Sequence, residues 1–333
     1  MDFYSDYYKM GIKNLNSVIK ESMKKTTFDK LRGSIIGVDF SLFLYRFVYN
    51  KNNPIECFLR QVHMFFRYKI LPIYVIDGNA PLEKQVTFDK RAQKRQKMYD
   101  LISDLLDKQH ENNSPTTSSR INSEITKLER RCVVFSQKQV QDILYFFELL
   151  GIPVIHENEE ADFILAKLSA ANKIDYILSD DSDVLVFGAK RVLKNFCIKE
   201  EKCELYDMDE ILANLGVTMQ KFVDICILCG CDYTTKIRNM NCGKSLQLIL
   251  QWGSIEEVTK NTEYQINLEQ IQKARELFYK ELPMGTMDRI SASIVKKNCK
   301  LEELEIFLRA KIEKKFLIPI FMHSLIQTKF IKY

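Results

Sequence analysis

The chain has 333 residues, which is enough for one large domain or two ordinary ones. A hydrophobic fraction of 46% predicts a sizeable core, and no apolar run of about 18 residues predicts a membrane span. The net charge of +5 is modest, so its distribution matters more than its sum. The nine cysteines are irregularly spaced, which favours a reducing compartment, the nucleus or the cytoplasm, and the acidic N-terminus does not form a secretory signal.

The first quarter of the chain alternates helical and strand patterns. Residues 1–9 are expected to be an N-terminal extension, and a helical pattern then runs from Met10 to about Met23. Both predicted strands that follow end in an acid, Asp39 and Asp77. Apolar periodicity gives the order strand 35–39, helix 41–49, helix 54–69 and strand 72–77.

Residues 84–135 are predicted to form a basic helical hairpin inserted into the α/β core. Its first helix carries basic residues at spacings of mostly three or four, which places them on one side: Lys84, Lys90, Arg91, Lys94, Arg95 and Lys97. The polar stretch from His110 to Ser119 is expected to be a mobile loop tip. A second helix, 120–131, adds Lys127, Arg130 and Arg131. A solvated helix face is the alternative, but a long insertion with a flexible tip suits a lid.

Two pairs of carboxylates flank the stretch from Glu160 to Asp183. Glu160 and Asp162 open a predicted helix, whereas Asp181 and Asp183 follow a predicted strand at 174–178. Taken separately, the first pair would suit a helix dipole and the second pair would suit helix N-caps. Together with Asp39 and Asp77 they predict several acids in one crevice, where the carboxyl ends of parallel strands meet. Such a cluster would repel itself without cations, so it indicates a site for hard divalent ions such as Mg²⁺.

Beyond the hairpin, the pattern predicts a helix at 137–150, a short strand at 153–155 and two more strands near 191–197 and 203–206. The rest of the chain is predicted to be mostly helical, with helices near 207–214, 218–229, 243–251, 268–280, 301–312 and 317–328. The Gly243–Ser245 run is not a P-loop, because Arg238 replaces the required glycine and no strand precedes it. A helix-turn-helix that binds phosphate through backbone amides and lysine fits better.

Four cysteines in this half raise the question of a zinc site, and they are Cys226, Cys229, Cys231 and Cys242. Two of them lie within an apolar helical run, and the spacing does not match a zinc knuckle. Buried free thiols are therefore expected instead.

From Met10 to about Gln251 the chain resembles the flap endonuclease family of structure-specific 5′ nucleases. Seven pieces match in family order: Met10-Gly11-Ile12 with Leu15, Val38-Asp39 with Ser41, Val75-Ile76-Asp77-Gly78, Gly151-Ile152-Pro153, Glu160-Ala161-Asp162, Asp181-Ser182-Asp183 and Gly230-Cys231-Asp232-Tyr233. The resemblance implies an α/β, PIN-like fold with a mostly parallel central sheet flanked by helices. The nuclease core would span 10–206 with a helical arch at 84–135, and a helical DNA-binding region would span 207–333 with a helix-two-turn-helix near 218–251.

The resemblance also implies roles for individual residues. Two Mg²⁺ ions, replaceable by Mn²⁺, would be held by Asp39, Asp77, Glu160, Asp162, Asp181, Asp183 and Asp232, the last completing the site from the helical region. Lys84 and Arg91 would act with Asp181 in catalysis by contacting the scissile phosphate. DNA contacts would come from Gly11, Tyr45, Lys90, Lys94, Arg95, Lys127, Arg130, Arg131, Arg238 and Lys244. The alternative for Tyr45 is a core tyrosine.

The implied activity is Mg²⁺-dependent cleavage of 5′ flaps and 5′ ends of DNA in replication, recombination or repair. Its substrates would be branched, nicked or gapped duplexes, bound by a monomer without a sliding-clamp motif. The interval between Asp39 and Asp77 is shorter than in cellular members, so a junction-resolving enzyme is an alternative, as is an inactive DNA-binding scaffold. The usual Gly-Ile-Gly turn is Asn239-Met240-Asn241 here, and K⁺ is a candidate ligand of that turn. The composition suggests a member from a large DNA virus.

Overall fold

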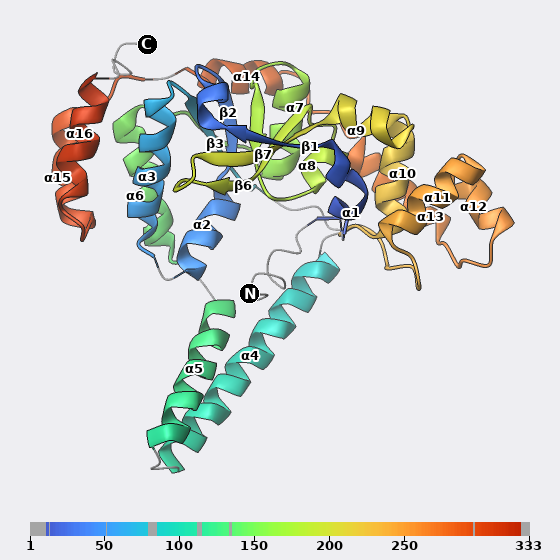
Figure 1. Ribbon diagram of the computed structural model, residues 1–333, viewed down its shortest axis with the longest axis horizontal. Coiled ribbons are helices and arrows are strands. Elements are labelled where there is room, and N and C mark those ends of the chain that lie inside the picture. The colour runs from blue at the N-terminus through green and yellow to red at the C-terminus, as the bar shows by residue number, and fades with distance from the viewer. Residues whose placement is uncertain are drawn as a thin grey trace.

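A seven-stranded sheet forms the centre of the molecule (Figure 1). The computed structural model describes residues 11–12, 14–50, 52–78, 85–111, 115–132, 135–295 and 297–327. The strands are β1 (Met23–Thr27), β2 (Ile35–Asp39), β3 (Leu71–Ile76), β4 (Val154–His156), β5 (Tyr176–Leu178), β6 (Arg191–Cys197) and β7 (Lys202–Asp207). Their order is β1-β7-β6-β5-β2-β3-β4. Strands β6, β5, β2, β3 and β4 pair in parallel, and only β1 and β7 run antiparallel to their neighbours.

Helices cover both faces of this sheet and extend beyond its ends. Those nearest the sheet are α1 (Asn16–Ile19), α2 (Phe40–Tyr49), α3 (Pro54–Arg67), α6 (Gln137–Leu150), α7 (Ala161–Ala170), α8 (Asp183–Val186), α9 (Met208–Leu215) and α14 (Thr286–Ser293). One end carries α10 (Met219–Cys229), α11 (Cys242–Trp252), α12 (Ile255–Asn261) and α13 (Leu268–Phe278), and the other carries α15 (Leu301–Lys311) and α16 (Leu317–Gln327). Two short 3-10 turns, η1 (Lys20–Ser22) and η2 (Phe28–Leu31), flank β1.

Two hydrophobic cores lie on opposite faces of the sheet, because successive strand residues point to opposite sides. Ile73 and Val75 of β3 belong to the first core, which includes side chains of α1, α7, α8 and α10. Tyr74, between them in sequence, belongs to the second core with side chains of α2, α3, α6 and α16. The Tyr74 ring stacks on Phe147 at 4.1 Å, and its hydroxyl donates a 2.7 Å hydrogen bond to Gln61. The sheet is thus buried on both sides, as parallel strands require.

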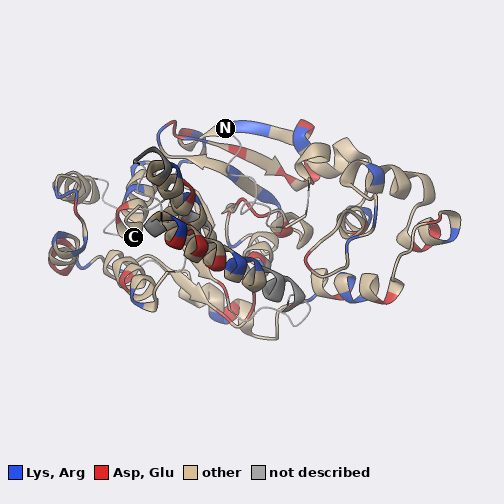
Figure 2. Cartoon of the chain, turned by 90° about the horizontal axis from the view of Figure 1, so that it is seen from below, with Lys and Arg blue, Asp and Glu red and all other residues tan. Residues whose placement is uncertain are grey.

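The two longest helices of the described ranges, α4 (Gln85–Glu111) and α5 (Pro115–Arg131), pack on each other and project from the core as a hairpin (Figure 1). Their charges are unevenly distributed along α4. The basic residues Lys94 and Lys97 lie in the half nearer the core, whereas Asp100, Asp104 and Asp107 follow toward the tip. Both signs are therefore present along the hairpin (Figure 2), because Lys108 also lies near the tip end of α4.

The predicted fold class is confirmed, and most predicted elements are present within one or two residues of their predicted ends. The prediction of a loop from His110 to Ser119 was wrong in its bounds, because α4 continues to Glu111 and α5 begins at Pro115. Proline is well suited to a first helical position. The prediction of a helix from Met10 to about Met23 was also wrong, because α1 has only one turn and residues 23–27 form β1 against β7. The predicted extension at 1–9 lies outside the described residues, and the division into domains stays a prediction.

No single helix of the described ranges is both long enough and apolar enough to cross a membrane. Helices α9 and α10 meet that test only as a pair, and they are bent by 81° at their junction. Most of α10 is buried in the first core.

One disulfide joins the end of α10 to the start of α11, between Cys229 and Cys242. The expectation of free thiols was therefore wrong for this pair, although Cys226 and Cys231 are free and buried. The two bonded cysteines are 13 positions apart, and the loop between them turns back so that their Cα atoms are 4.7 Å apart. The bond encloses the loop that contains Asp232 and Arg238.

Removal of this disulfide should destabilise the protein. Closing a loop of this length restricts the unfolded chain by about 3 kcal/mol in the chain-entropy description. We expect the double variant Cys229→Ser/Cys242→Ser to lose about that much free energy of unfolding in urea, and a reductant to lower the wild type to the same value. The control Cys57→Ser/Cys197→Ser changes two free, half-buried cysteines. Equal losses in both double variants would contradict a bond between Cys229 and Cys242.

Candidate active site

Acidic residues gather where three adjacent parallel strands end. Strand β2 lies between β3 and β5, and Asp39 is its last residue. Asp77 follows the end of β3, and Asp181 and Asp183 lie in the segment that follows β5. The sheet therefore brings together acids that are up to 144 positions apart in the chain, Asp39 and Asp183 being the farthest pair. This is the edge at which open α/β sheets bind their ligands.

Asp39 is held at the centre of this edge by two hydrogen bonds. Its Oδ1 accepts from the backbone N–H of Leu42, which makes it the N-cap of α2, at 3.0 Å. Its Oδ2 accepts from the hydroxyl of Ser179 at 3.2 Å. Burial, together with the negative charges of Asp77 and Asp181, raises the pKa of Asp39 from 3.8 to about 8. The three acids are therefore close enough to repel one another.

The segment after β5 is ordered by its own polar groups. The backbone N–H of Asp181 donates to the Ser179 hydroxyl at 3.1 Å, and the N–H of Asp183 donates to Asp181 Oδ1 at 2.9 Å. Asp183 is the first residue of α8, whose remaining three residues are apolar and buried. Asp181 and Asp183 are 8% and 1% exposed, so both are buried and neither projects into solvent.

Glu160 and Asp162 reach the same edge from the start of α7. The backbone N–H of Ala161, between them, donates to Asp77 Oδ1 at 3.0 Å and ties α7 to the end of β3. The hydroxyl of Tyr233 donates to Glu160 Oε2 at 2.9 Å. Burial first, and then the charges of Glu160 and Asp183, raise the pKa of Tyr233, so its proton remains available for that bond. Asp232, next to Tyr233, is half-buried in the loop after α10.

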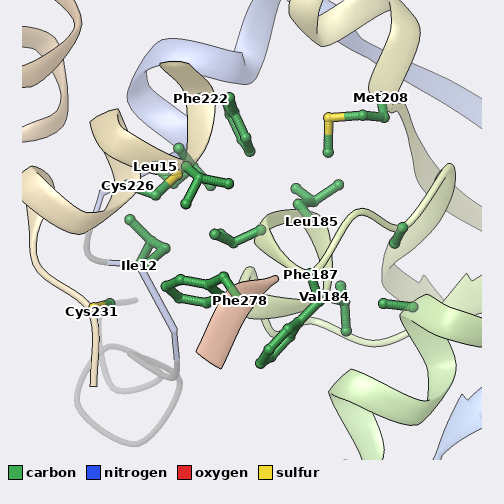
Figure 3. Close-up of a cluster of buried hydrophobic side chains, with 14 of the residues drawn as sticks. Ile12, Leu15, Val184, Leu185, Phe187, Met208, Phe222, Cys226, Cys231 and Phe278 are labelled. Carbon is green, nitrogen blue, oxygen red and sulfur yellow. The ribbon is translucent and has the colours of Figure 1, made fainter. Parts of the chain in front are cut away.

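Gly11 lies against the carboxylates of the segment after β5. Ile12 and Leu15 are buried in the first core (Figure 3), and they fix the chain at this point. A Cβ atom added to Gly11 would lie 2.1 Å from Asp181 Oδ1 and 2.8 Å from Asp183 Oδ1. The backbone φ of +74° also favours glycine here. Gly11 therefore leaves open a space that any side chain would fill.

The residues present fit a divalent cation that keeps part of its hydration shell. Carboxylate oxygens are the ligands of Mg²⁺, and their mutual repulsion at Asp39 is the kind that a cation relieves. Within the described ranges, no group of three or more acidic, histidine or cysteine side chains is placed so that it could hold a metal ion by itself. Mg²⁺ usually binds through one or two carboxylates and several waters, so such a group is not required.

The structure describes the side chains of only some of the predicted basic residues. Lys84 lies outside the described residues, as do the side chains of Lys90, Arg91, Arg130 and Arg131, although these four belong to α4 and α5. Lys94 and Lys127 are exposed, and Arg95 is half-buried. Tyr45 is half-buried, and its ring packs edge-on against Phe135 at 4.8 Å, so its role stays a prediction.

Two asparagines shape the turn between α10 and α11. Asn239 adopts a left-handed φ of +59°, as asparagine tolerates. The side chain of Asn241 is the N-cap of α11 and accepts from the backbone N–H of Lys244 at 2.9 Å. Arg238 is exposed and Lys244 is half-buried beside this cap. The predicted helix-turn-helix is thus present, between residues 219 and 252.

Sequence reasoning missed three residues at this site, which are Ser179, Lys194 and Tyr233. Tyr233 was part of a matching motif but was given no role. Lys194 in β6 is 4% exposed, and the only signal in the sequence is a lysine inside an otherwise strand-like run. Ser179 directly follows β5, just beyond the predicted strand at 174–178, and nothing in the sequence marks it as a partner of Asp39.

A PIN-like sheet with carboxylates at the ends of its parallel strands, beside a projecting helical hairpin, defines a class of metal-dependent nucleases. Two family profiles match the chain, the XPG N-terminal domain at residues 10–98 and the XPG I-region at residues 151–232. Flap endonuclease 1 of Zea mays is 31% identical over 305 residues, covering 84% of this chain and 77% of the relative. Flap endonuclease 1-B of Physcomitrium patens is 30% identical over 274 residues, covering 76% and 75%.

Solved structures share the fold at lower identity. The catalytic core of Rad2 in complex with DNA substrate aligns with a TM-score of 0.66 and 20% identity, covering 96% of this chain and 99% of that one. Human GEN1 in complex with Holliday junction DNA gives 0.61 and 17%, covering 95% and 79%. The flap endonuclease-1 of Methanococcus jannaschii gives 0.58 and 18%, covering 92% and 96%.

The chain belongs to the flap endonuclease family. It is a nuclease of the structure-specific 5′ class, and this family is metal-dependent and generally uses Mg²⁺.

Replacement of Gly11 should reduce activity far more than its backbone strain alone explains. In Gly11→Ala the new methyl group would push Asp181 by about 1 Å, a displacement that can lower a rate by about 100-fold. Gly33→Ala is the matched control, because Gly33 has a similar φ of +79° with nothing within 4 Å of an added Cβ. We expect the control to keep its cleavage rate while losing about 1 kcal/mol of stability, because alanine is unfavourable in the left-handed region. Similar rates for the two variants would contradict the close approach of Gly11.

The raised pKa of Asp39 predicts a pH-dependent stability of the metal-free protein. Between about pH 4 and pH 8 the folded state holds a proton that the unfolded chain releases, so stability should fall as pH rises through that window. In EDTA, the unfolding temperature of the wild type should fall more steeply toward pH 8 than that of Asp39→Asn. Mg²⁺ should reduce the difference, because a cation stabilises the charged carboxylate. Parallel pH profiles in EDTA would contradict this assignment.

Proposed function

We propose that this protein hydrolyses phosphodiester bonds at 5′ flaps and 5′ ends of branched, nicked or gapped DNA. The observation that carries the proposal is the meeting of Asp39, Asp77, Asp181 and Asp183 at one sheet edge, with Glu160 next to Ala161, whose backbone N–H binds Asp77. A cluster of this kind has no structural use, because its members repel one another. Its use is to hold cations against a phosphate.

Two Mg²⁺ ions, which Mn²⁺ can replace, would be held by the acidic set Asp39, Asp77, Glu160, Asp162, Asp181, Asp183 and Asp232. When bound, they would supply a water of lowered pKa and stabilise the attacking and leaving oxygens of the phosphate. Asp39 accepts hydrogen bonds through both of its carboxylate oxygens, from the Leu42 N–H and the Ser179 hydroxyl, and Asp181 accepts one from the Asp183 N–H. Tyr233 orients Glu160, and Gly11 keeps the approach to Asp181 open.

The rest of the chain would hold the DNA. Lys84 and Arg91 would contact the scissile phosphate and stabilise its developing charge. The hairpin would admit a single-stranded 5′ end, with Lys94, Arg95 and Lys127 along its base and sides. The turn before α11, with Arg238 and Lys244, would bind duplex backbone away from the cut, and K⁺ is a candidate ligand there. Affinity would come mainly from the phosphates, so it should fall with salt.

A junction-resolving enzyme is the second candidate. The structural neighbours include human GEN1 in complex with Holliday junction DNA as well as the Rad2 core with a DNA substrate. Only 37 residues lie between Asp39 and Asp77, fewer than in cellular members of the family. In this interval the family builds its contacts to the far side of the junction. An inactive scaffold is disfavoured, because it would gain nothing from a repulsive acidic cluster. We further propose that the protein acts as a monomer in the nucleus or cytoplasm and without a sliding clamp.

Neutralising Asp181 should separate binding from cleavage. Asp181→Asn keeps the oxygen that accepts from the N–H of Asp183 but removes a ligand charge. We expect flap cleavage in Mg²⁺ to fall by more than about 100-fold, since losing an outer-shell partner alone costs 10- to 100-fold. Flap binding measured in Ca²⁺ should persist. Asp175→Asn, an exposed acid near the start of β5, is the control for removal of one charge.

The substrate distinguishes the candidates in the same assay. Cutting of a 5′ flap and a nicked duplex by the wild type supports the proposal, and cutting of a four-way junction alone supports the junction-resolving enzyme. Normal flap cleavage by Asp181→Asn would contradict the proposed site.

A further inference from the structure

Lys194 is a buried lysine beside the acidic cluster that the proposed mechanism does not use. It lies in β6 and is only 4% exposed. Its ammonium lies 5.9 Å from the centre of the Tyr206 ring. Within the described part of the chain, its side chain makes no hydrogen bond and no ion pair. A buried ammonium in that condition is unfavourable unless nearby negative charge stabilises it.

The position of Lys194 in β6 directs it toward the acids. Side chains alternate along the strand, so Lys194 shares a face with Val192, which lies in the first core together with α7 and α8. Leu193 points to the other face and pairs with Leu178 at the end of β5. The backbone at Leu193 accepts from the N–H of Ser179, so Lys194 is anchored next to the segment that leads to Asp181.

The residue after Lys194 strengthens this anchor. The backbone N–H of Asn195 donates to Asp180 Oδ1 at 2.8 Å, and Asp180 also pairs with Arg46. The side chain of Asn195 donates to Glu204 Oε2 at 2.7 Å. Glu204 is the cross-strand neighbour of Lys194, but its hydrogen bonds go to Asn195 and Tyr206. Glu204 therefore does not pair with the ammonium, and the negative charges that act on it are mainly those of the acidic cluster.

The charges that act on Lys194 come mainly from that cluster. Burial lowers the pKa of Lys194, and the carboxylates of Asp181, Asp162, Asp183 and Glu204 oppose the shift. Three of these four acids are predicted metal ligands, and they come from two different helix starts. The ammonium therefore lies behind the cluster, on its protein side, since Lys194 is buried while the cluster borders solvent at Asp77.

We propose that Lys194 is a positioning residue whose ammonium is a fixed countercharge to Asp162, Asp181 and Asp183. It holds these carboxylates together before cations bind, and it lowers the affinity of the site for divalent cations by adding a like charge nearby. This inference rests on the proposed metal site. Through Lys194, β6 has a direct electrostatic role in how that site binds divalent cations.

Removing the charge should tighten metal binding. Lys194→Met keeps the length and apolar stem of the side chain without its charge, and Lys194→Arg keeps the charge. We expect the metal-free, DNA-free protein to bind Mg²⁺ about tenfold more tightly in Lys194→Met than in the wild type, as a like charge within several ångströms of a buried site would imply. Lys194→Arg should stay within about twofold of the wild type. Lys190→Met removes an exposed lysine next to β6 and controls for net charge.

The experiment is calorimetric titration of each protein with Mg²⁺ in the absence of DNA, with circular dichroism to confirm folding. A cleavage titration adds a second measure, in which the half-saturating Mg²⁺ concentration should fall in Lys194→Met while the rate at saturation changes less. Equal affinity in Lys194→Met and Lys190→Met would overturn the inference, as would weaker binding in Lys194→Met. An absence of Mg²⁺ binding in the wild type, or undiminished binding in Asp181→Asn, would instead overturn the proposed metal site.

Discussion

The repulsion among carboxylates at one edge of the sheet is the constraint on which the rest of this structure depends. Asp39 cannot leave the edge, because it ends β2 and caps α2. Burial first, and then the charges of Asp77 and Asp181, raise its pKa to about 8, so a charged carboxylate is unfavourable here without a cation. Hydrogen bonds from Leu42, Ser179 and Ala161 offset part of that repulsion, and bound cations would offset the rest.

Much of the fold can be understood as a means of holding those charges. The parallel strands are buried on both faces, which fixes their register and therefore the place where each strand ends. Ile12 and Leu15 insert into the first core and bring Gly11 against Asp181. The loop closed by Cys229 and Cys242 contains Tyr233, which reaches Glu160. Segments from the beginning, middle and second half of the chain thus meet at one site.

The sequence was sufficient to predict those elements whose burial follows from their own apolar residues. The apolar runs ending at Asp39 and Asp77 predicted strands and placed both acids at strand ends, because strand length and face follow from the run itself. The sequence was insufficient to predict elements that depend on partners far away in the chain. Strand β1 pairs with β7 some 180 residues away, and its sequence MKKTT has no buried run of its own. The bond between Cys229 and Cys242 and the burial of Lys194 depend on how loops and carboxylates from other segments fold around them.

The most direct test of this account is cleavage of a 5′-labelled flap duplex by the purified protein, with Mg²⁺ and with EDTA. We expect cutting near the base of the flap in Mg²⁺ and none in EDTA, because the acidic edge is useful only when it holds cations. Cutting that persists in EDTA would show that the carboxylates serve another purpose. A flap that stays intact in Mg²⁺ while the protein binds it tightly would contradict a nuclease acting at this edge.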